Sequence, residues 1–329
     1  MNNPASNPQD PDDRQPPLRT AVLIPCHNEE AAIGSVVQGF REALPSAAIY
    51  VYDNNSSDRT ADVAAAAGAI VRAESHQGKG FVVRRMFADI EADIYVLVDG
   101  DGTYDPEAVP DLIDLLRAGP LDMVNGARVT GAGVSHRPGH AFGNRLLSGL
   151  VRKIFGDRFR DMLSGLKIFS RRYVKSFPAL SAGFEIETEL TVHALELAMP
   201  VAEVETRYFE RAEGSESKLS TFRDGARIMR TIAVLVKEER PLQFFSILAV
   251  VLAGISILLA VPLLVTFLET GLVPRFPTAI LSTGIMILAV LSFTAGMILD
   301  TVTRGRREAK RMHYLAVPAV GNRGRRRGE

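Results

Sequence analysis

The sequence predicts an α/β domain with a mostly parallel sheet, followed by amphipathic helices and a hairpin of two membrane-spanning helices. Short runs rich in β-branched residues alternate with alanine-rich stretches between residues 19 and about 208. Two long uncharged apolar runs then occupy residues 242–268 and 276–299. Strands and helices that alternate at this spacing are typical of a parallel sheet covered on both faces.

The strands and helices of the α/β part follow from its hydrophobic pattern. Predicted strands lie at residues 20–24, 49–52, 70–73, 94–98 and 123–127, and predicted helices at residues 31–43, 60–67, 79–90 and 106–118. In an open parallel sheet, ligands bind beyond the carboxyl ends of the strands. The polar residues that follow these strands are therefore the candidate site.

Both apolar runs exceed the roughly 20 residues that a helix needs to cross a bilayer. Helices buried in a soluble core rarely run this long without a charge, so we favour membrane helices over a buried pair. The connector 269–275 is short, so the pair would form a hairpin with both ends on one side. Lys and Arg flank both ends, and the positive-inside bias therefore places the α/β domain and both termini in the cytoplasm.

The remaining segments bound the organisation of the chain. Residues 1–18 are rich in Pro, Asn, Asp and Gln, which predicts a disordered leader rather than a signal peptide. Residues 220–241 interleave apolar and basic residues, which fits a juxtamembrane amphipathic helix on the membrane or a linker helix packed on the domain. Residues 300–329 form a basic tail that suits a membrane surface.

Composition excludes several classes of function. The 38 Lys and Arg residues balance 38 Asp and Glu residues, so the chain as a whole predicts no nucleic-acid partner. Cys26 is the single cysteine of the sequence, so no disulfide can form within the chain and no zinc cluster is indicated.

The strongest chemical signal is the motif DGDGTYD after the fourth predicted strand. Asp99 and Asp101 stand two positions apart, so in an extended strand end their side chains point the same way. Two carboxylates that face one place suit Mg²⁺ or Mn²⁺ held together with a diphosphate. Asp-Gly-Asp is also common in turns, and it is the position at the end of a strand that favours the metal site.

Three further motifs follow other predicted strands: IPCHNEE, VYDNNSSDRT and HQGKG. Asp53 of the second could accept hydrogen bonds from a nucleotide base or ribose. The glycines on either side of Lys79 in the third would let the backbone approach a ligand closely. Each of these motifs is weak alone.

Taken together, the motifs resemble those of the GT-A-fold glycosyltransferases of family 2, and most of all the branch that makes polyisoprenyl-phosphate sugars. The matching pieces are IPCHNEE, VYDNNSSDRT, HQGKG, DGDGTYD, NGAR, DMLSGLKIFSRR, GFEIETEL and RAEGSESKL. They assign residues 19–219 to a GT-A catalytic domain. The resemblance implies a metal-dependent, inverting transfer of a hexose-type sugar from a nucleotide-sugar, UDP-linked rather than GDP-linked, to undecaprenyl phosphate. It also implies an inner-membrane location and allows a homo-oligomer such as a tetramer.

The resemblance assigns roles to matching positions. The nucleotide-sugar would be bound by Pro25, Asn28, Glu29, Asp53, Lys79, Asp99, Gly100, Asp101, Glu187, Arg211, Ser217 and Lys218. The acceptor phosphate would be bound by Arg128, Arg145 and Ser164, and the metal by Asp99 and Asp101. Catalysis would depend on Asp99, Asp101, Arg128, Arg211 and Lys218. The last motif has one more residue after Gly214 than is usual, which leaves its register open.

The chemistry of a lipid phosphate agrees with a site rich in cations. A phosphate monoester is largely ionised at pH 7, with a second pKa of about 6, so its oxygen attacks without a strong base. The barrier then lies in the departure of the nucleoside diphosphate, whose growing charge a metal and fixed cations stabilise. The glycine-rich segment 131–140 is expected to be a mobile acceptor loop.

Other functions remain open on the sequence alone. A GDP-mannose-dependent polyprenyl-phosphate mannosyltransferase and a non-catalytic nucleotide-binding membrane scaffold are the alternatives. A processive polysaccharide synthase is disfavoured because the chain has no tryptophan. A hydrolase of the haloacid dehalogenase class needs a nucleophilic Asp after the first strand, where this chain has PCHN.

Overall fold

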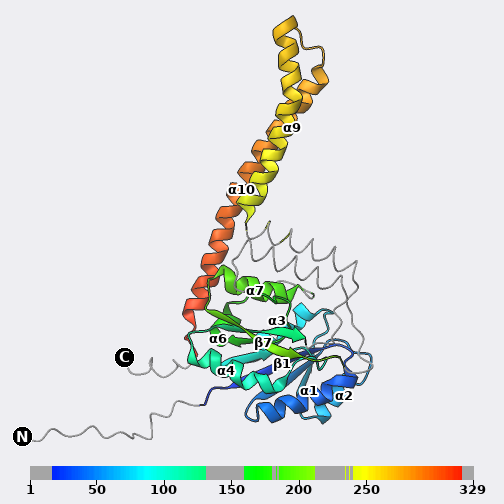
Figure 1. Cartoon of the computed structure of the whole chain (residues 1–329), viewed down its shortest axis with the longest axis vertical. Coiled ribbons are helices and arrows are strands. Elements are labelled where there is room, and N and C mark those ends of the chain that lie inside the picture. Colours follow the sequence, from blue (N-terminus) through cyan, green and yellow to red (C-terminus); the bar gives the residue numbers. More distant parts are fainter. Residues whose placement is uncertain are drawn as a thin grey trace, which may run out of the picture. The chain divides into compact units, whose positions relative to one another are not determined.

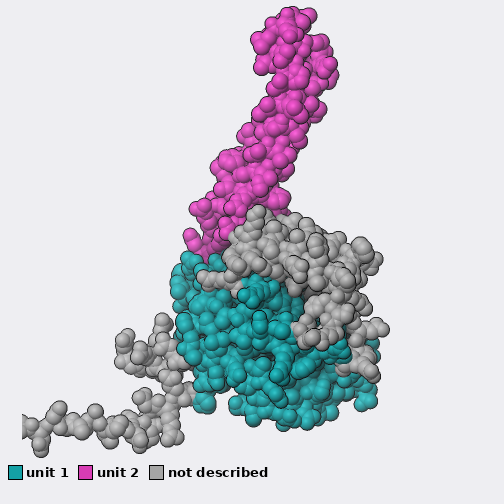
Figure 2. All heavy atoms as spheres, in the orientation of Figure 1, with its two compact units in different colours: residues 1–221, 310–329 teal, residues 222–309 magenta. Residues whose placement is uncertain are grey.

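The computed structural model describes residues 17–130, 159–179, 183, 185–211, 234, 237 and 240–320. The chain divides into two compact units, coloured separately in Figure 2. The first comprises residues 1–221 and 310–329, and the second comprises residues 222–309. Most of the predicted juxtamembrane segment 220–241 and the whole loop 131–140 lie outside the described residues.

A mixed sheet of seven strands forms the centre of the first unit, in the order β3-β2-β1-β4-β6-β5-β7. Its strands are β1 (Thr20–Cys26), β2 (Ala48–Asp53), β3 (Ile70–Ala73), β4 (Ile94–Leu97), β5 (Met123–Thr130), β6 (Lys167–Ser170) and β7 (Val201–Tyr208). All pairs are parallel except those that β6 makes with β4 and β5. The predicted mostly parallel sheet and its first five strands are confirmed, whereas β6 and β7 were not predicted.

Helices cover both faces of this sheet (Figure 1). They are α1 (Glu30–Ala43), α2 (Thr60–Ala66), α3 (Lys79–Asp89), the 3₁₀ turn η2 (Pro106–Ala108), α4 (Val109–Ala118), α6 (Arg171–Ser176) and α7 (Ile186–Glu196). The helix predicted at 106–118 begins as a 3₁₀ turn, and the Asp105 side chain caps this turn by accepting a hydrogen bond from the Glu107 N–H, 3.0 Å away. The other predicted helices agree within one residue.

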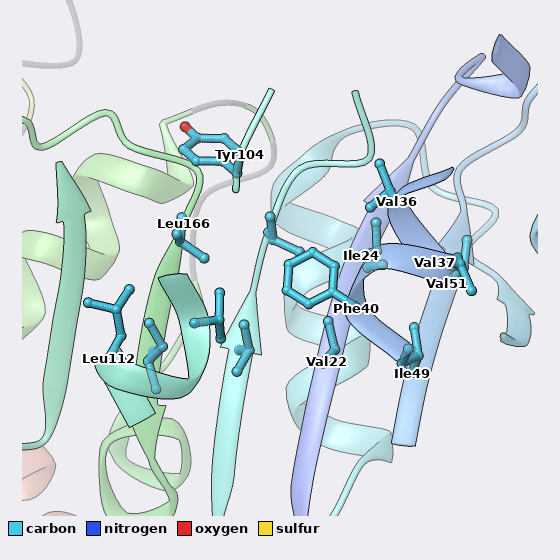
Figure 3. Packing of buried hydrophobic residues seen from close by; sticks show 14 of the residues in the cluster. Val22, Ile24, Val36, Val37, Phe40, Ile49, Val51, Tyr104, Leu112 and Leu166 are labelled. Atoms are coloured by element: carbon cyan, nitrogen blue, oxygen red, sulfur yellow. The ribbon is translucent and has the colours of Figure 1, made fainter. Parts of the chain in front are cut away.

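Alternation along β1 explains why the sheet needs helices on both faces. Val22 and Ile24 face a cluster that includes Phe40 of α1 and Leu112 of α4 (Figure 3). Leu23, on the opposite face, is equally buried. A strand buried on both faces has no polar alternation, and truncation of a buried ring such as Phe40 to alanine costs about 3–5 kcal/mol.

The opposite face of the sheet carries an aromatic cluster. The ring centroid of Phe87 of α3 lies 6.2 Å from that of Tyr95 on β4 and 6.0 Å from those of Phe169 and Phe177. These pairs are edge-to-face, the arrangement that the ring quadrupoles favour. The cluster fixes α3, whose first residue is Lys79, against the sheet.

The second unit contains α9 (Pro241–Thr270) and most of α10 (Phe276–Ala316). Their contact is lined by small residues, with Ala249 and Ser256 on α9 and Ser282, Ala289 and Gly296 on α10. Ser256 Oγ donates a hydrogen bond to the Ser282 carbonyl at 2.7 Å. Small residues let helix backbones approach closely, which is how helices associate in lipid.

The two helices have mean hydropathies of 2.9 and 2.1 over their apolar windows and are long enough to cross a membrane. They agree with the predicted hairpin. Helix α10 continues beyond residue 299, where the apolar run ends, as far as Ala316. An ion pair between Asp300 and Arg304, 2.9 Å apart and one turn apart on the helix, accompanies this extension into the basic tail.

Candidate active site

The DGDG turn directly follows β4 and carries the two predicted metal ligands. Asp101 Oδ1 accepts hydrogen bonds from the N–H and the hydroxyl of Thr103, at 3.2 and 2.6 Å, and these bonds close the turn. Gly100 lies so near β1 that a Cβ there would be 2.5 Å from the Cys26 sulfur. Gly102 has a φ of +75°, a left-handed conformation that glycine adopts without strain. The glycines therefore allow two carboxylates at this sheet edge.

Lys79, at the start of α3, lies against the first of these carboxylates. Its Nζ is 2.5 Å from Asp99 Oδ1 and also pairs with Glu187, at the start of α7. Burial disfavours the ammonium, but the two carboxylates outweigh burial and raise the pKa of Lys79 above its ordinary value. Lys79 is therefore a fixed positive charge that joins α3, the DGDG turn and α7.

Arg211 pairs with the second carboxylate. Its Nη2 is 2.7 Å from Asp101 Oδ2. The end of β7 brings it there, because Tyr208 forms an isolated bridge with Tyr104 and the Phe209 N–H donates to the Thr103 carbonyl at 2.8 Å. The predicted partners Ser217 and Lys218 follow in the same motif but lie outside the described residues, as does Arg145.

Asp99 and Asp101 fit a divalent cation by their donor chemistry, since both offer hard carboxylate oxygens and both balance positive charge already. Among the residues that the structure describes, no group of three or more His, Cys, Asp and Glu side chains could hold a metal ion. A cation at these two carboxylates would therefore need further oxygens from a ligand, as a diphosphate provides.

Arg128, on β5, is held in a fixed orientation by a residue that sequence reasoning missed. Asp161 accepts from its Nε at 2.7 Å, from its Nη2 at 2.8 Å and from its backbone N–H at 3.1 Å. Burial opposes both charges, but the pair prevails, so the pKa of Arg128 is raised and that of Asp161 is lowered. Within the described residues Arg128 Nη1 has no partner, so this end of the guanidinium can meet an anion.

The loop that carries Asp161 is itself supported from below. Asn125 Nδ2 donates to the Asp161 carbonyl at 2.8 Å and to Glu203 at 2.9 Å, and Lys167 Nζ donates to Asn125 Oδ1 at 2.7 Å. Burial lowers the pKa of Lys167 to about 8. Lys167 and Asp161 both belong to the motif DMLSGLK, whose composition alone gave no role for either.

Ser164 and Gly165 complete the same loop. The Ser164 hydroxyl is buried and donates to the Gly126 carbonyl at 2.5 Å, which ties the loop to β5. The predicted contact of this hydroxyl with an acceptor phosphate stays a prediction. The Gly165 N–H donates to the Tyr104 hydroxyl at 2.6 Å. A Cβ at Gly165 would overlap the Asp99 carboxylate, so only glycine allows this approach.

The ends of β1 and β2 form the predicted nucleoside side of the site. Cys26 and Asp53 are register partners in the parallel pair of strands, so the polar residues after them meet. Asn28 has a φ of +52°, and its side-chain oxygen accepts from the Ser57 N–H at 2.8 Å. Glu29 donates its N–H to Thr60 Oγ1 at 2.8 Å. Asn28 therefore ties two loops together, and its contact with a nucleoside stays a prediction, as do those of Pro25 and Glu29.

Asp53 and Asn54 have different roles at the end of β2. Asp53 Oδ2 accepts from the Ser56 N–H at 3.2 Å, whereas its Oδ1 is buried without a hydrogen-bond partner among the described residues. Asn54 donates to the carbonyls of Glu74 and His76, at 2.9 and 2.8 Å, and accepts from the Gly78 N–H at 2.7 Å. Asn54, which sequence reasoning missed, thereby fixes the loop in front of Lys79.

The structure thus gathers several predicted residues at one edge of the sheet. The charged ones with direct mutual contacts are Lys79, Asp99, Glu187, Asp101 and Arg211. The ammonium of Lys79 contacts the predicted metal ligand Asp99, and the binding of Lys79 to the nucleotide-sugar stays a prediction.

Comparisons with known proteins bear on this arrangement. Residues 21–177 match the family model "Glycosyl transferase family 2". An uncharacterised protein of Shigella flexneri is 58% identical over 155 residues, which cover 47% of this chain and 95% of that protein. The glycosyltransferase AglJ of Haloferax volcanii is 34% identical and covers 70% of this chain and 76% of its own. The dolichyl-phosphate hexose transferase of the same organism is 32% identical, over 67% of this chain and 95% of its own.

Solved structures show the same fold. A glucosyl-3-phosphoglycerate synthase of Mycobacterium tuberculosis, crystallised with Mn²⁺ and UDP-glucose, superimposes with a TM-score of 0.55 at 25% identity. The match covers 67% of this chain and 78% of that one. The similar chains thus include an enzyme of nucleotide-sugars and a transferase named for a lipid phosphate.

Proposed function

The chain belongs to glycosyl transferase family 2, and we propose that it transfers a hexose-type sugar from a UDP-sugar to a polyisoprenyl phosphate at the cytoplasmic face of a membrane. One observation carries the proposal. Two carboxylates at the end of β4, each paired with a cation, lie at the same sheet edge as Arg128. Nη1 of the Arg128 guanidinium has no partner among the described residues and can bind an anion. Such a site has separate places for a diphosphate and for a second phosphate.

The donor half of the proposal is supported by three features. Asp53 Oδ1 is buried without a donor among the described residues, and an N–H or hydroxyl of a nucleoside would satisfy it. Asp99 and Asp101 would hold Mg²⁺ or Mn²⁺, which when bound would neutralise charge on the donor diphosphate. The similar mycobacterial synthase was crystallised with Mn²⁺ and UDP-glucose, which favours UDP over GDP as the nucleotide.

The acceptor half of the proposal is supported by the membrane helices and by Arg128. Helices α9 and α10 are apolar enough to span a bilayer, and one relative is named a dolichyl-phosphate hexose transferase. Basic residues flank both ends of the predicted hairpin, so the positive-inside bias favours a cytoplasmic location for both termini. Arg128, oriented by Asp161, would bind the phosphate of the lipid.

The transfer itself needs positioning more than base catalysis. An ionised phosphate oxygen held by Arg128 attacks the anomeric carbon of the sugar, and the bond from that carbon to the diphosphate breaks. The nucleoside diphosphate leaves with the electron pair, and attack from the opposite face inverts the anomeric centre. Arg211 and Lys79 fix positive charge beside the departing anion. No proton has to be removed from the nucleophile.

The proposal is tested with membranes that contain the full chain, incubated with undecaprenyl phosphate and a panel of radiolabelled UDP-glucose, UDP-N-acetylglucosamine and GDP-mannose. Label should enter the lipid extract from a UDP-sugar, and Asp101→Ala should reduce the transfer by a hundredfold or more. Asp114→Asn is the matched control, because Asp114 is an exposed carboxylate that pairs with Arg117 on the same helix. Lipid label from no donor, or full activity of Asp101→Ala, would overturn the proposal.

A further inference from the structure

Tyr104 carries a buried hydroxyl between the two halves of the site. The residue is 5% exposed and belongs to the motif DGDGTYD, in which only the aspartates had been given a function. Figure 3 shows the ring at the margin of the apolar cluster, with the oxygen directed away from the cluster. Its position therefore raises the question of what the hydroxyl binds.

The ring of Tyr104 is fixed by its neighbours. Its centroid lies 5.3 Å from that of Tyr208, and the two rings meet edge to face at 78°. The same two residues form a backbone bridge between the DGDG turn and the end of β7. A ring held by both stacking and backbone pairing directs its hydroxyl to one place.

The Tyr104 hydroxyl accepts one hydrogen bond but donates none among the described residues. Its oxygen accepts from the Gly165 N–H at 2.6 Å. A tyrosine hydroxyl also donates one hydrogen bond, and the described residues provide no acceptor for it. Buried donors are nearly always paired, so a free donor in a binding site indicates a ligand.

The surroundings indicate an anionic ligand on the acceptor side. Gly165 and Asp161 belong to one loop, and Asp161 orients Arg128. The guanidinium carbon of Arg128 is 5.6 Å from the centroid of the Tyr208 ring, the ring that packs on Tyr104. Asp99 lies behind Gly165 and already pairs with Lys79. A hydroxyl donor bound to Gly165 and a guanidinium bound to Asp161, both in contact with the same loop, suit a phosphate oxygen.

We propose that the Tyr104 hydroxyl donates a hydrogen bond to a non-bridging oxygen of the acceptor phosphate, beside Arg128; this assignment rests on the proposed function. Tyr104 would then be a substrate-binding residue. The Tyr104 oxygen accepts a hydrogen bond from Gly165, which lies next to Asp99, a predicted ligand of the donor diphosphate and its metal. The Tyr104 hydroxyl would donate its own hydrogen bond to the phosphate of the lipid. The motif DGDGTYD would accordingly serve both substrates, through its aspartates and its tyrosine.

The experiment compares Tyr104→Phe with Tyr95→Phe in the full-length chain. Tyr95 is also buried in the first unit, and among the described residues its hydroxyl bonds only to the backbone of Ala92 and Ile90, so its loss controls for the loss of a buried hydroxyl. The KM for undecaprenyl phosphate is measured at saturating donor, and UDP affinity is measured by calorimetry. Tyr104→Phe should raise the acceptor KM about 10- to 100-fold, as expected for a hydrogen bond to a charged group. UDP affinity should stay within about twofold, and Tyr95→Phe should change neither.

Several outcomes overturn the assignment. An unchanged acceptor KM in folded Tyr104→Phe would limit the hydroxyl to its contact with Gly165. A loss of UDP affinity with an unchanged acceptor KM would assign the hydroxyl to the donor diphosphate. If Tyr104→Phe fails to fold, replacement of Tyr104 by 4-aminophenylalanine, which keeps a donor on the same ring, decides the case. A near-normal acceptor KM then supports donation, and a rise of tenfold or more overturns it.

The proposed function fails separately from this assignment. If the wild-type chain labels no lipid phosphate from any donor, the function itself is wrong. If the wild-type chain labels the lipid and Tyr104→Phe behaves like the wild type, only the role of Tyr104 is wrong.

Discussion

The guanidinium of Arg128 and the carboxylate of Asp161 form two parallel hydrogen bonds, 2.7 and 2.8 Å long. Bidentate pairs of this kind fix both the charge and the orientation of the arginine. The side chain of Asp161 is 11% exposed and that of Arg128 is 26% exposed, so solvent screens the pair only in part. The pair therefore holds the Arg128 guanidinium on β5 in one orientation.

Asp161→Asn should loosen the orientation of the Arg128 guanidinium without changing the shape of the loop. The variant keeps the size of the side chain but replaces one accepting oxygen with an NH₂ group and removes the negative charge, so we expect about 1–3 kcal/mol of lost stability. The acceptor KM should rise at least tenfold because Arg128 loses its fixed orientation. Thermal unfolding and lipid-labelling kinetics measure the two effects. Glu91→Gln is the control, since Glu91 is 50% exposed and surface pairs contribute about 0–1 kcal/mol. Equal kinetics of both variants would contradict a positioning role of Asp161.

Lys79→Met should leave the carboxylates of Asp99 and Glu187 in a buried site without their shared cation. Removal of one partner from a buried ion pair costs about 3–5 kcal/mol, so the variant should be strongly destabilised. Glu187→Gln in the same chain should restore part of the loss, because it removes one of the two orphaned charges. Thermal unfolding of the wild type, both single variants and the double variant gives the coupling. Additive losses would show that the two residues do not interact in solution.

The fold was predictable from sequence as far as β5 because local pattern decides it there. Each strand from β1 to β5 is a short apolar run followed by polar residues, and each helix between them is amphipathic or rich in alanine. Strands β6 and β7 could not be predicted in the same way. The buried Lys167 interrupts the apolar character of β6, and β7 reads VAEVETRY, which is only half buried.

The candidate site was predictable where a motif carries charge and not where a residue acts through another. Asp99 and Asp101 stand out by their spacing. Asp161 and Asn54 do not, because each acts through a contact that is distant in sequence. Asp161 binds Arg128, 33 residues away, and Asn54 binds Gly78, 24 residues away. Sequence distance hides such pairs, and only the register of the sheet and the loops between strands brings them together.

The pH dependence of stability should report His193, which lies in α7 among aromatic rings. Burial lowers its pKa to about 3, with a smaller contribution from Lys310. The imidazole of His193 therefore takes up a proton near pH 6.5 in the unfolded chain but only near pH 3 in the folded chain. Its neutral form contributes a stability that is fully present above pH 6.5 and is lost as the pH falls toward 3. Between pH 7 and 5 the loss should be about 2 kcal/mol, at 1.36 kcal/mol per pH unit.

His193→Phe should remove this dependence. Phenylalanine can replace the imidazole beside Tyr173 and Phe177, whose ring centroids lie 5.4 and 5.3 Å away. Urea unfolding at pH 7 and pH 5 compares the two chains, and the wild type should lose about 2 kcal/mol more than the variant. Identical losses would show that His193 is charged in the folded chain at pH 5.

Tyr314→Phe should destabilise the first unit, to which the last turns of α10 belong. The Tyr314 hydroxyl donates to Asp122 Oδ2 at 2.7 Å, and Arg172 lies 4.8 Å from the centre of its ring. Asp122 is fully buried, so removal of this donor leaves one carboxylate oxygen with less support, at a cost of about 1.5–3 kcal/mol. Tyr50→Phe is the matched control, since no hydrogen bond of the Tyr50 hydroxyl is found among the described residues. Thermal unfolding of the full chain in detergent measures both, and equal stabilities would show that the end of α10 contributes nothing to the first unit.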